Sequence, residues 1–123
     1  MQSKWFLSVT LLLTLLITVA ACQGTSEVVA DAGLDFDVQS GEAPTFDGCS
    51  STGDITTYQW KISEAPGDME ESVGNIIHSD SSCSFTLGAE MGVDDMGRWA
   101  IELTVIDGEG NQATDTVVVE VLE

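Results

Sequence analysis

The chain has 123 residues, and its 21 aspartates and glutamates outnumber its 3 lysines and arginines to give a formal net charge of −18. This length allows one domain, and the scarcity of Lys and Arg excludes binding to a nucleic-acid backbone and electrostatic docking on anionic lipid. The mean hydropathy is nevertheless positive, at +0.15, so apolar and acidic residues are segregated along the chain.

The first 21 residues contain no acidic residue and have the layout of a secretory signal peptide. Residues 1–4 are a polar start with one positive charge, residues 5–19 are an apolar run, and small residues follow at Ala20 and Ala21. A transmembrane anchor is the alternative, since residues 5–21 are just long enough to cross a bilayer about 30 Å thick. The small residues favour cleavage, and both alternatives place the rest of the chain outside the cytoplasm.

The end of this segment, Val19-Ala20-Ala21-Cys22, resembles the lipobox of bacterial lipoproteins. The resemblance implies cleavage before Cys22, attachment of a diacylglyceryl group to its thiol and acylation of the new amino terminus. Two or more acyl chains hold a protein stably on a membrane, whereas one holds it only marginally. Gln23 replaces the Asp that retains Gram-negative lipoproteins at the inner membrane, which implies the outer membrane or cell surface. An ordinary signal peptide that ends near a Cys is the alternative.

The predicted organisation is a signal peptide over residues 1–21, a lipidated tether over residues 22–30 and one domain over residues 31–123. Removing the signal peptide leaves Lys61 and Arg98 as the basic residues against all 21 acids. Like charges repel one another, so such a surface keeps the domain soluble and discourages self-association.

Apolar and polar residues alternate in five segments of this domain. The apolar sets are Leu34, Phe36 and Val38; Tyr58, Trp60 and Ile62; Cys83, Phe85 and Leu87; Trp99, Ile101, Leu103 and Val105; and Val117, Val119 and Val121. A period of two places each set on one face of a strand, toward a core. Turn-forming clusters separate the strands at residues 48–53, 66–68, 88–97 and 107–111. The pattern predicts an all-β antiparallel sandwich whose last two strands form a hairpin.

Three blocks resemble the PKD domain, in the order in which that family has them. They are Ala-Asp-Ala-Gly at residues 30–33, Gly-Asp-Ile-Thr-Thr-Tyr-Gln-Trp at residues 53–60 and Leu-Thr-Val-Ile-Asp-Gly-Glu-Gly-Asn at residues 103–111. The resemblance covers residues 30–122 and implies an immunoglobulin-like β-sandwich, as in bacterial surface proteins and animal ectodomains. The family's Asp-Phe-Gly-Asp-Gly turn is absent after Trp60, and Cys49 replaces a small polar residue. No role of that acidic turn is therefore carried over.

The three cysteines are Cys22, Cys49 and Cys83. If Cys22 carries lipid, Cys49 and Cys83 remain in an oxidising compartment that permits a disulfide. On the chain-entropy model such a bridge contributes about 4 kcal/mol to stability. Two free thiols, or pairing with another chain, are the alternatives. The sequence does not favour a zinc site, because the chain has one His and no Cys-x-x-Cys.

The aromatic residues of the alternating segments are predicted to belong to the core. Trp60 and Trp99 lie on inward-facing positions, and Tyr58 lies on the face of Trp60 with its hydroxyl at the rim. An exposed pair of Tyr58 and Trp60 that stacks on a ligand is the alternative.

No catalytic residue and no cofactor-binding residue is predicted. His78 is the only histidine, so any Ser-His-Asp or Cys-His arrangement would need it, and nothing near it marks a nucleophile. Gly108-x-Gly110-x-x-Ala113 formally matches a dinucleotide fingerprint, but a β-patterned run follows where a helix is needed to hold phosphate. The chain is therefore predicted not to be an enzyme.

One acidic segment resembles the start of an EF-hand calcium loop. Asp107-x-Glu109-x-Asn111 mimics the start of that loop. The pattern then fails, because Gln112 stands where Gly is required and Val118 where a bidentate acid is required. No metal ligand is assigned, and a looser, weak calcium site on acids at one end of the sandwich is kept as an alternative.

The predicted function is that of a non-catalytic, extracytoplasmic module held to the membrane by lipid on Cys22. It would mediate interaction with proteins or carbohydrates, adhesion, or envelope structure. Its partner would be a protein or a glycan, and it would not bind nucleic acid. A calcium-responsive surface module that uses Asp31, Asp54 or Asp107 is one alternative. An accessory subunit of an envelope complex is another.

Overall fold

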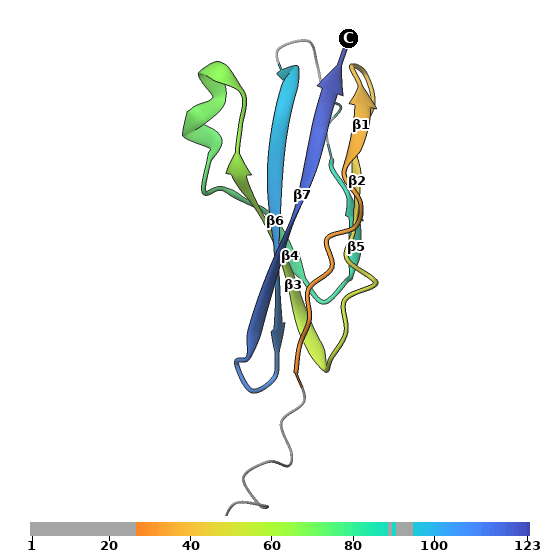
Figure 1. Cartoon of the computed structure of the whole chain (residues 1–123), viewed down its shortest axis with the longest axis vertical. Coiled ribbons are helices and arrows are strands. Elements are labelled where there is room, and N and C mark those ends of the chain that lie inside the picture. Colours follow the sequence, from red (N-terminus) through yellow and green to blue (C-terminus); the bar gives the residue numbers. More distant parts are fainter. Residues whose placement is uncertain (1–26, 89, 91–94) are drawn as a thin grey trace, which may run out of the picture.

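A computed structural model describes residues 27–88, 90 and 95–123, which form two β-sheets packed face to face (Figure 1). The elements in chain order are β1 (Phe36–Gln39), β2 (Thr45–Asp47), β3 (Ile55–Glu64), the 3₁₀ helix η1 (Gly67–Ser72), β4 (Ile76–Asp80), β5 (Ser84–Thr86), β6 (Gly97–Asp107) and β7 (Gln112–Leu122). No helix in these residues is both long and apolar enough to cross a membrane.

The larger sheet has the strand order β1-β7-β6-β3-β4, and β2 and β5 form the smaller one. The predicted hairpin is confirmed, since β6 and β7 pair antiparallel from Gly97 opposite Val121 to Ile106 opposite Gln112. The pairing is antiparallel throughout, with one exception: β1 runs parallel to β7. β1 lies beside β7 at the edge of the larger sheet, and the chain then passes to β2 in the other sheet.

Residues at every second position of the long strands form the core, as predicted. The fully buried large side chains are Trp60, Leu103, Val105, Val117, Val119 and Val121. Phe46 and Phe85 of the smaller sheet stack on each other with ring centroids 5.2 Å apart, and they lie 5.5 Å and 5.9 Å from the ring of Trp60. Aromatic contacts of this kind join the two layers.

Leu34 is a correction to the predicted core, because its side chain is 91% exposed. It precedes β1, at a point where the chain has not yet joined the sheet. The carboxylate of the next residue makes the first attachment, since Asp35 Oδ1 accepts a hydrogen bond from Val118 N at 2.9 Å. Phe36 is thus the first residue of the alternating segment whose side chain faces the core.

Three elements were not predicted as such: the short strands β2 and β4, and η1. β2 has three residues and a single inward side chain, Phe46. β4 pairs with β3 through a register shift between Trp60 and Lys61, and η1 buries none of its residues fully. Elements this short or irregular carry no periodicity that a sequence could show.

The chain enters the sandwich at the end opposite η1 (Figure 1). Val28 is buried, and Val29 exchanges backbone hydrogen bonds with Thr52 at 2.9 Å and 3.0 Å. Ala32 N donates to Asp115 Oδ2 at 2.8 Å. Val28 and Val29, which belong to the predicted tether, are therefore packed on the sandwich.

Candidate functional site

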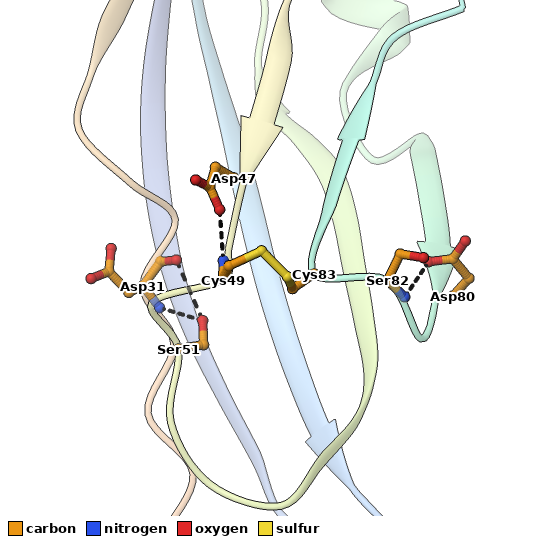
Figure 2. The surroundings of a disulfide bond; sticks show 7 residues. All are labelled: Asp31, Asp47, Cys49, Ser51, Asp80, Ser82 and Cys83. Atoms are coloured by element: carbon orange, nitrogen blue, oxygen red, sulfur yellow. Dashed lines mark hydrogen bonds between the residues drawn. A yellow bond between two sulfur atoms is a disulfide. The ribbon is translucent and has the colours of Figure 1, made fainter.

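The structure joins Cys49 to Cys83, which confirms the predicted disulfide (Figure 2). The two Cα atoms are 4.8 Å apart, within the usual range for a bridge. The bond lies just beyond Asp47 opposite Ser84, the last pair between β2 and β5. Gly48 N donates to Cys83 O at 2.8 Å, so this backbone bond continues the pairing of the smaller sheet by one more step beside the disulfide.

Aspartate side chains shape the turns on both sides of this bridge (Figure 2). Asp47 Oδ1 accepts from Cys49 N at 2.8 Å, and Asp80 Oδ1 accepts from Ser82 N at 2.8 Å. Each bond links a carboxylate to the amide two residues later, which is the pattern of an Asx turn. These acids therefore set the path of the chain into each cysteine.

Gly48 could not carry a larger side chain in this packing. A Cβ atom there would lie 2.9 Å from Leu103 Cδ2, 3.1 Å from Cys83 O and 3.1 Å from Trp60 Cζ2. The glycine therefore lets the backbone beside the disulfide approach the aromatic core. Trp60 thus packs close to the backbone that carries Cys49.

His78 has a packing role that the sequence did not indicate. Its ring stacks on Phe85 with centroids 4.3 Å apart and an angle of 6° between the planes. Its Nε2 lies 3.0 Å from Asp80 Oδ2, and its position on β4 is opposite Trp60 on β3. His78 is thus a half-buried side chain that covers the aromatic core, rather than a freely exposed one.

Trp60 is not available for stacking on a ligand, because none of its surface is exposed. Tyr58 is partly buried and packs against the core cluster. Trp99 is also in the core, and its Nε1 donates to Asp95 O at 2.8 Å. The prediction that these aromatic residues belong to the core is confirmed, and the alternative of a ligand-stacking pair is wrong.

Asp107 organises the β6–β7 turn. Its Oδ1 accepts hydrogen bonds from Glu109 N and Asn111 N, and its Oδ2 accepts one from Asn111 Nδ2, all at 2.9 Å. The side-chain bond from Asn111 has the largest effect on the pKa of Asp107 and lowers it; the backbone bonds act in the same direction, and burial opposes them. Both carboxylate oxygens thus already accept hydrogen bonds from residues of the turn.

The other acids of the alternative calcium site do not gather around Asp107. Asp31 Oδ1 accepts from Gly33 N at 2.9 Å, and Asp31 N donates to Ser51 Oγ at 2.9 Å. Within residues 27–88, 90 and 95–123, no three Asp, Glu, His or Cys side chains are close enough to hold a metal ion. The structure therefore does not bring Asp31, Asp54 and Asp107 together as a calcium site.

We expect Asp107→Asn to change how stability depends on pH. The pKa of Asp107 in the folded chain lies below its ordinary value of 3.8. Its carboxylate therefore contributes stability above pH 3.8, and this contribution is lost as the pH falls through the lower folded-state pKa. Urea unfolding at pH 7 and at pH 3 measures this effect. Between these two pH values the free energy of unfolding should fall more for the wild type than for Asp107→Asn.

Glu109→Gln is the matched control for this comparison, because it removes a carboxylate of the same turn that accepts none of the three bonds. It should keep the wild-type dependence on pH. Equal losses of stability in the wild type and in Asp107→Asn would contradict this role of the carboxylate.

Cys22 and residues 1–21 lie outside the residues that the structure describes. The lipidation of Cys22 and the signal peptide therefore remain predictions.

A surface feature that the sequence did not indicate lies at the end of the sandwich that carries η1. A hollow there is lined by Pro66, Gly67, Asp68, Met69 and Met96, and 38% of Met96 is exposed. The only signal in the sequence was a Pro-Gly turn, because the partner Met96 lies far along the chain.

Comparison with known proteins identifies the architecture. The family model of the K319L-like PKD domain matches residues 32–121. The solution structure of the PKD domain from the KIAA 1837 protein is 26% identical in sequence, with a TM-score of 0.55, and the match covers 82% of this chain and 91% of that one. No curated protein matches the chain.

Two larger proteins also match the chain over part of their own length. A nucleoside hydrolase-related protein from Saccharophagus degradans is 21% identical with a TM-score of 0.57, over 80% of this chain but only 26% of that one. A 2,6-sialyltransferase from Photobacterium is 12% identical with a TM-score of 0.48, over 80% of this chain and 19% of that one. The first likeness shows the fold alone, and the second supports no inference.

Proposed function

The chain belongs to the K319L-like PKD domain family, and from this membership we propose that it is a non-catalytic, lipid-anchored module of the cell envelope that binds a protein or carbohydrate partner. The observation that carries the proposal is the PKD fold itself, closed by a Cys49–Cys83 disulfide. Disulfides form and persist in oxidising compartments outside the cytoplasm. A fold does not name a ligand, so the proposal concerns the class of module.

The proposed anchor is lipid on Cys22, at the end of the lipobox-like segment. The acidic domain cannot hold an anionic membrane by charge, so attachment would depend on the acyl chains. Val28 is already packed on the sandwich. An extended chain spans about 3.5 Å per residue, so the domain would lie within about 20 Å of Cys22.

Replacing Cys22 tests the anchor. We expect Cys22→Ala to move the protein from the membrane fraction to the soluble fraction, or to stop its maturation, because no thiol remains to accept the diacylglyceryl group. Gln23→Ala is the matched control and should stay in the membrane fraction. Immunoblots of fractionated cells measure both. A Cys22→Ala chain that stays on membranes with an unlipidated N-terminus would refute the anchor.

A further inference from the structure

Apolar side chains are exposed at the end of the sandwich that carries η1. We call the residues that line the hollow there, Pro66, Gly67, Asp68, Met69 and Met96, the methionine patch. Met96 is 38% exposed, and Val73, which follows η1, is 45% exposed. Methionine side chains are flexible and polarisable, which suits them to contact with a partner.

Packing fixes the two sides of this patch relative to each other. Gly97 has a φ of +123°, and a Cβ atom there would lie 2.8 Å from Pro66 Cβ. Only a glycine therefore lets the start of β6 approach the start of η1, which brings Met96 beside Met69.

The segment that carries η1 is also held at its far end. Gly74 N donates to Ile62 O at 2.8 Å, and Ile62 N donates to Asn75 O at 2.9 Å. These bonds attach the segment to β3, so the patch is a formed surface.

The hollow carries an acidic rim, which we define as Asp68, Glu70 and Glu71. Asp68 lines the hollow itself, and Glu70 and Glu71 follow it within the six residues of η1. The two cations of the described part of the chain are paired with other acids, since Lys61 lies 3.4 Å from Glu102 and Arg98 lies 3.8 Å from Glu64. The rim therefore complements a partner that brings positive charge.

The patch also lies at an accessible end of the molecule. The described chain begins at one end of the sandwich, and η1 is at the other (Figure 1). If Cys22 is anchored, as the proposed function holds, the methionine patch points away from the membrane.

We propose that the methionine patch binds a basic segment of another protein, with an apolar side chain of that segment in the hollow and its Lys or Arg side chains on the acidic rim. The apolar contact would supply burial, and the charges would supply specificity and a fast approach. This inference names the kind of partner that the proposed module binds. It rests on the proposed function only for the location of the domain at the cell envelope.

Two charge-reversal variants of the full chain, purified in detergent, test the proposal. The rim variant combines Asp68→Lys, Glu70→Lys and Glu71→Lys. The matched control combines Glu27→Lys, Asp54→Lys and Glu109→Lys, which changes the net charge equally by replacing exposed acids at or near the opposite end. The probe is a synthetic ten-residue peptide of alternating Lys and Leu, in 0.15 M salt, where charges are screened beyond about 8 Å.

In the wild type we expect the peptide to shift the methyl NMR signals of Met69 and Met96. The rim variant should weaken binding at least tenfold, and the control variant should weaken it less than threefold. Met96→Ala should weaken binding of the Lys-Leu peptide but not binding of a ten-residue peptide of Lys alone, because only the Lys-Leu peptide has an apolar side chain to fill the hollow.

Equal weakening by the two charge-reversal variants would overturn the proposal, because it would indicate general attraction to an acidic protein. Absence of binding, or shifts that spare both methionines, would also overturn it. The assay contains no membrane, so its result is independent of whether Cys22 is lipidated.

Discussion

Leu103→Ala is expected to lower the free energy of unfolding by about 3–5 kcal/mol, whereas Leu34→Ala should change it by less than about 0.5 kcal/mol. The two substitutions remove the same atoms from opposite environments. Leu103 is fully buried, and Leu34 is 91% exposed. The difference between them therefore reports the burial of Leu103 together with the cavity that its truncation leaves.

The large effect at Leu103 follows from its neighbours. It is paired with Trp60 across β3 and β6, and its Cδ2 lies 2.9 Å from where a Cβ on Gly48 would be. A cavity at this point would open beneath the aromatic contacts between the two sheets. A small domain has a stability of about 5–15 kcal/mol, so the loss is a large share of the total.

Urea unfolding followed by tryptophan fluorescence measures both variants. The midpoint of Leu103→Ala should fall far below that of the wild type, and the midpoint of Leu34→Ala should stay with the wild type. Comparable shifts for the two variants would contradict the assignment of the core.

The double variant Cys49→Ala/Cys83→Ala is expected to lose about 4 kcal/mol of stability, because the bridge closes a loop with a sequence separation of 34 residues. The local structure makes the domain sensitive to this loss. β2 and β5 have three residues each, and a two-stranded pair is marginally stable by itself. The disulfide holds β2 and β5 together, and Phe46 and Phe85 of this pair cover Trp60 of the larger sheet.

Reduction provides an internal control for the disulfide. Dithiothreitol should lower the urea midpoint of the wild type toward that of the double variant, and it should leave the double variant unchanged. A wild-type midpoint that is the same with and without reductant, despite complete reduction shown by mass, would contradict the stabilising role.

The sequence was sufficient to predict the core residues where apolar and polar residues alternate along a long strand. Trp60, Leu103 and Val117 occupy inward positions in runs that the structure places in β3, β6 and β7, each ten or eleven residues long. The turn of the last hairpin was also predictable, because Asp107 and Asn111 are turn residues whose side chains bond locally.

The remaining features depend on contacts between residues that are distant in the chain. The parallel pairing of Phe36 with Val119 has no local signal. Leu34 continues the alternation but precedes the point at which Asp35 bonds to β7, so the pattern overstates the strand by one inward residue. Met69 and Met96 form one surface because Gly97, which has no side chain, lets Pro66 lie close to the start of β6.

The intact mass of the protein isolated from cell membranes tests the central proposal, a lipid-anchored PKD module outside the cytoplasm, most directly. The predicted chain begins at Cys22, carries the added mass of a diacylglyceryl group with or without an N-acyl chain, and is two hydrogens short of free thiols at Cys49 and Cys83. A chain that retains residues 1–21, or that begins near Cys22 without added lipid mass, would contradict it.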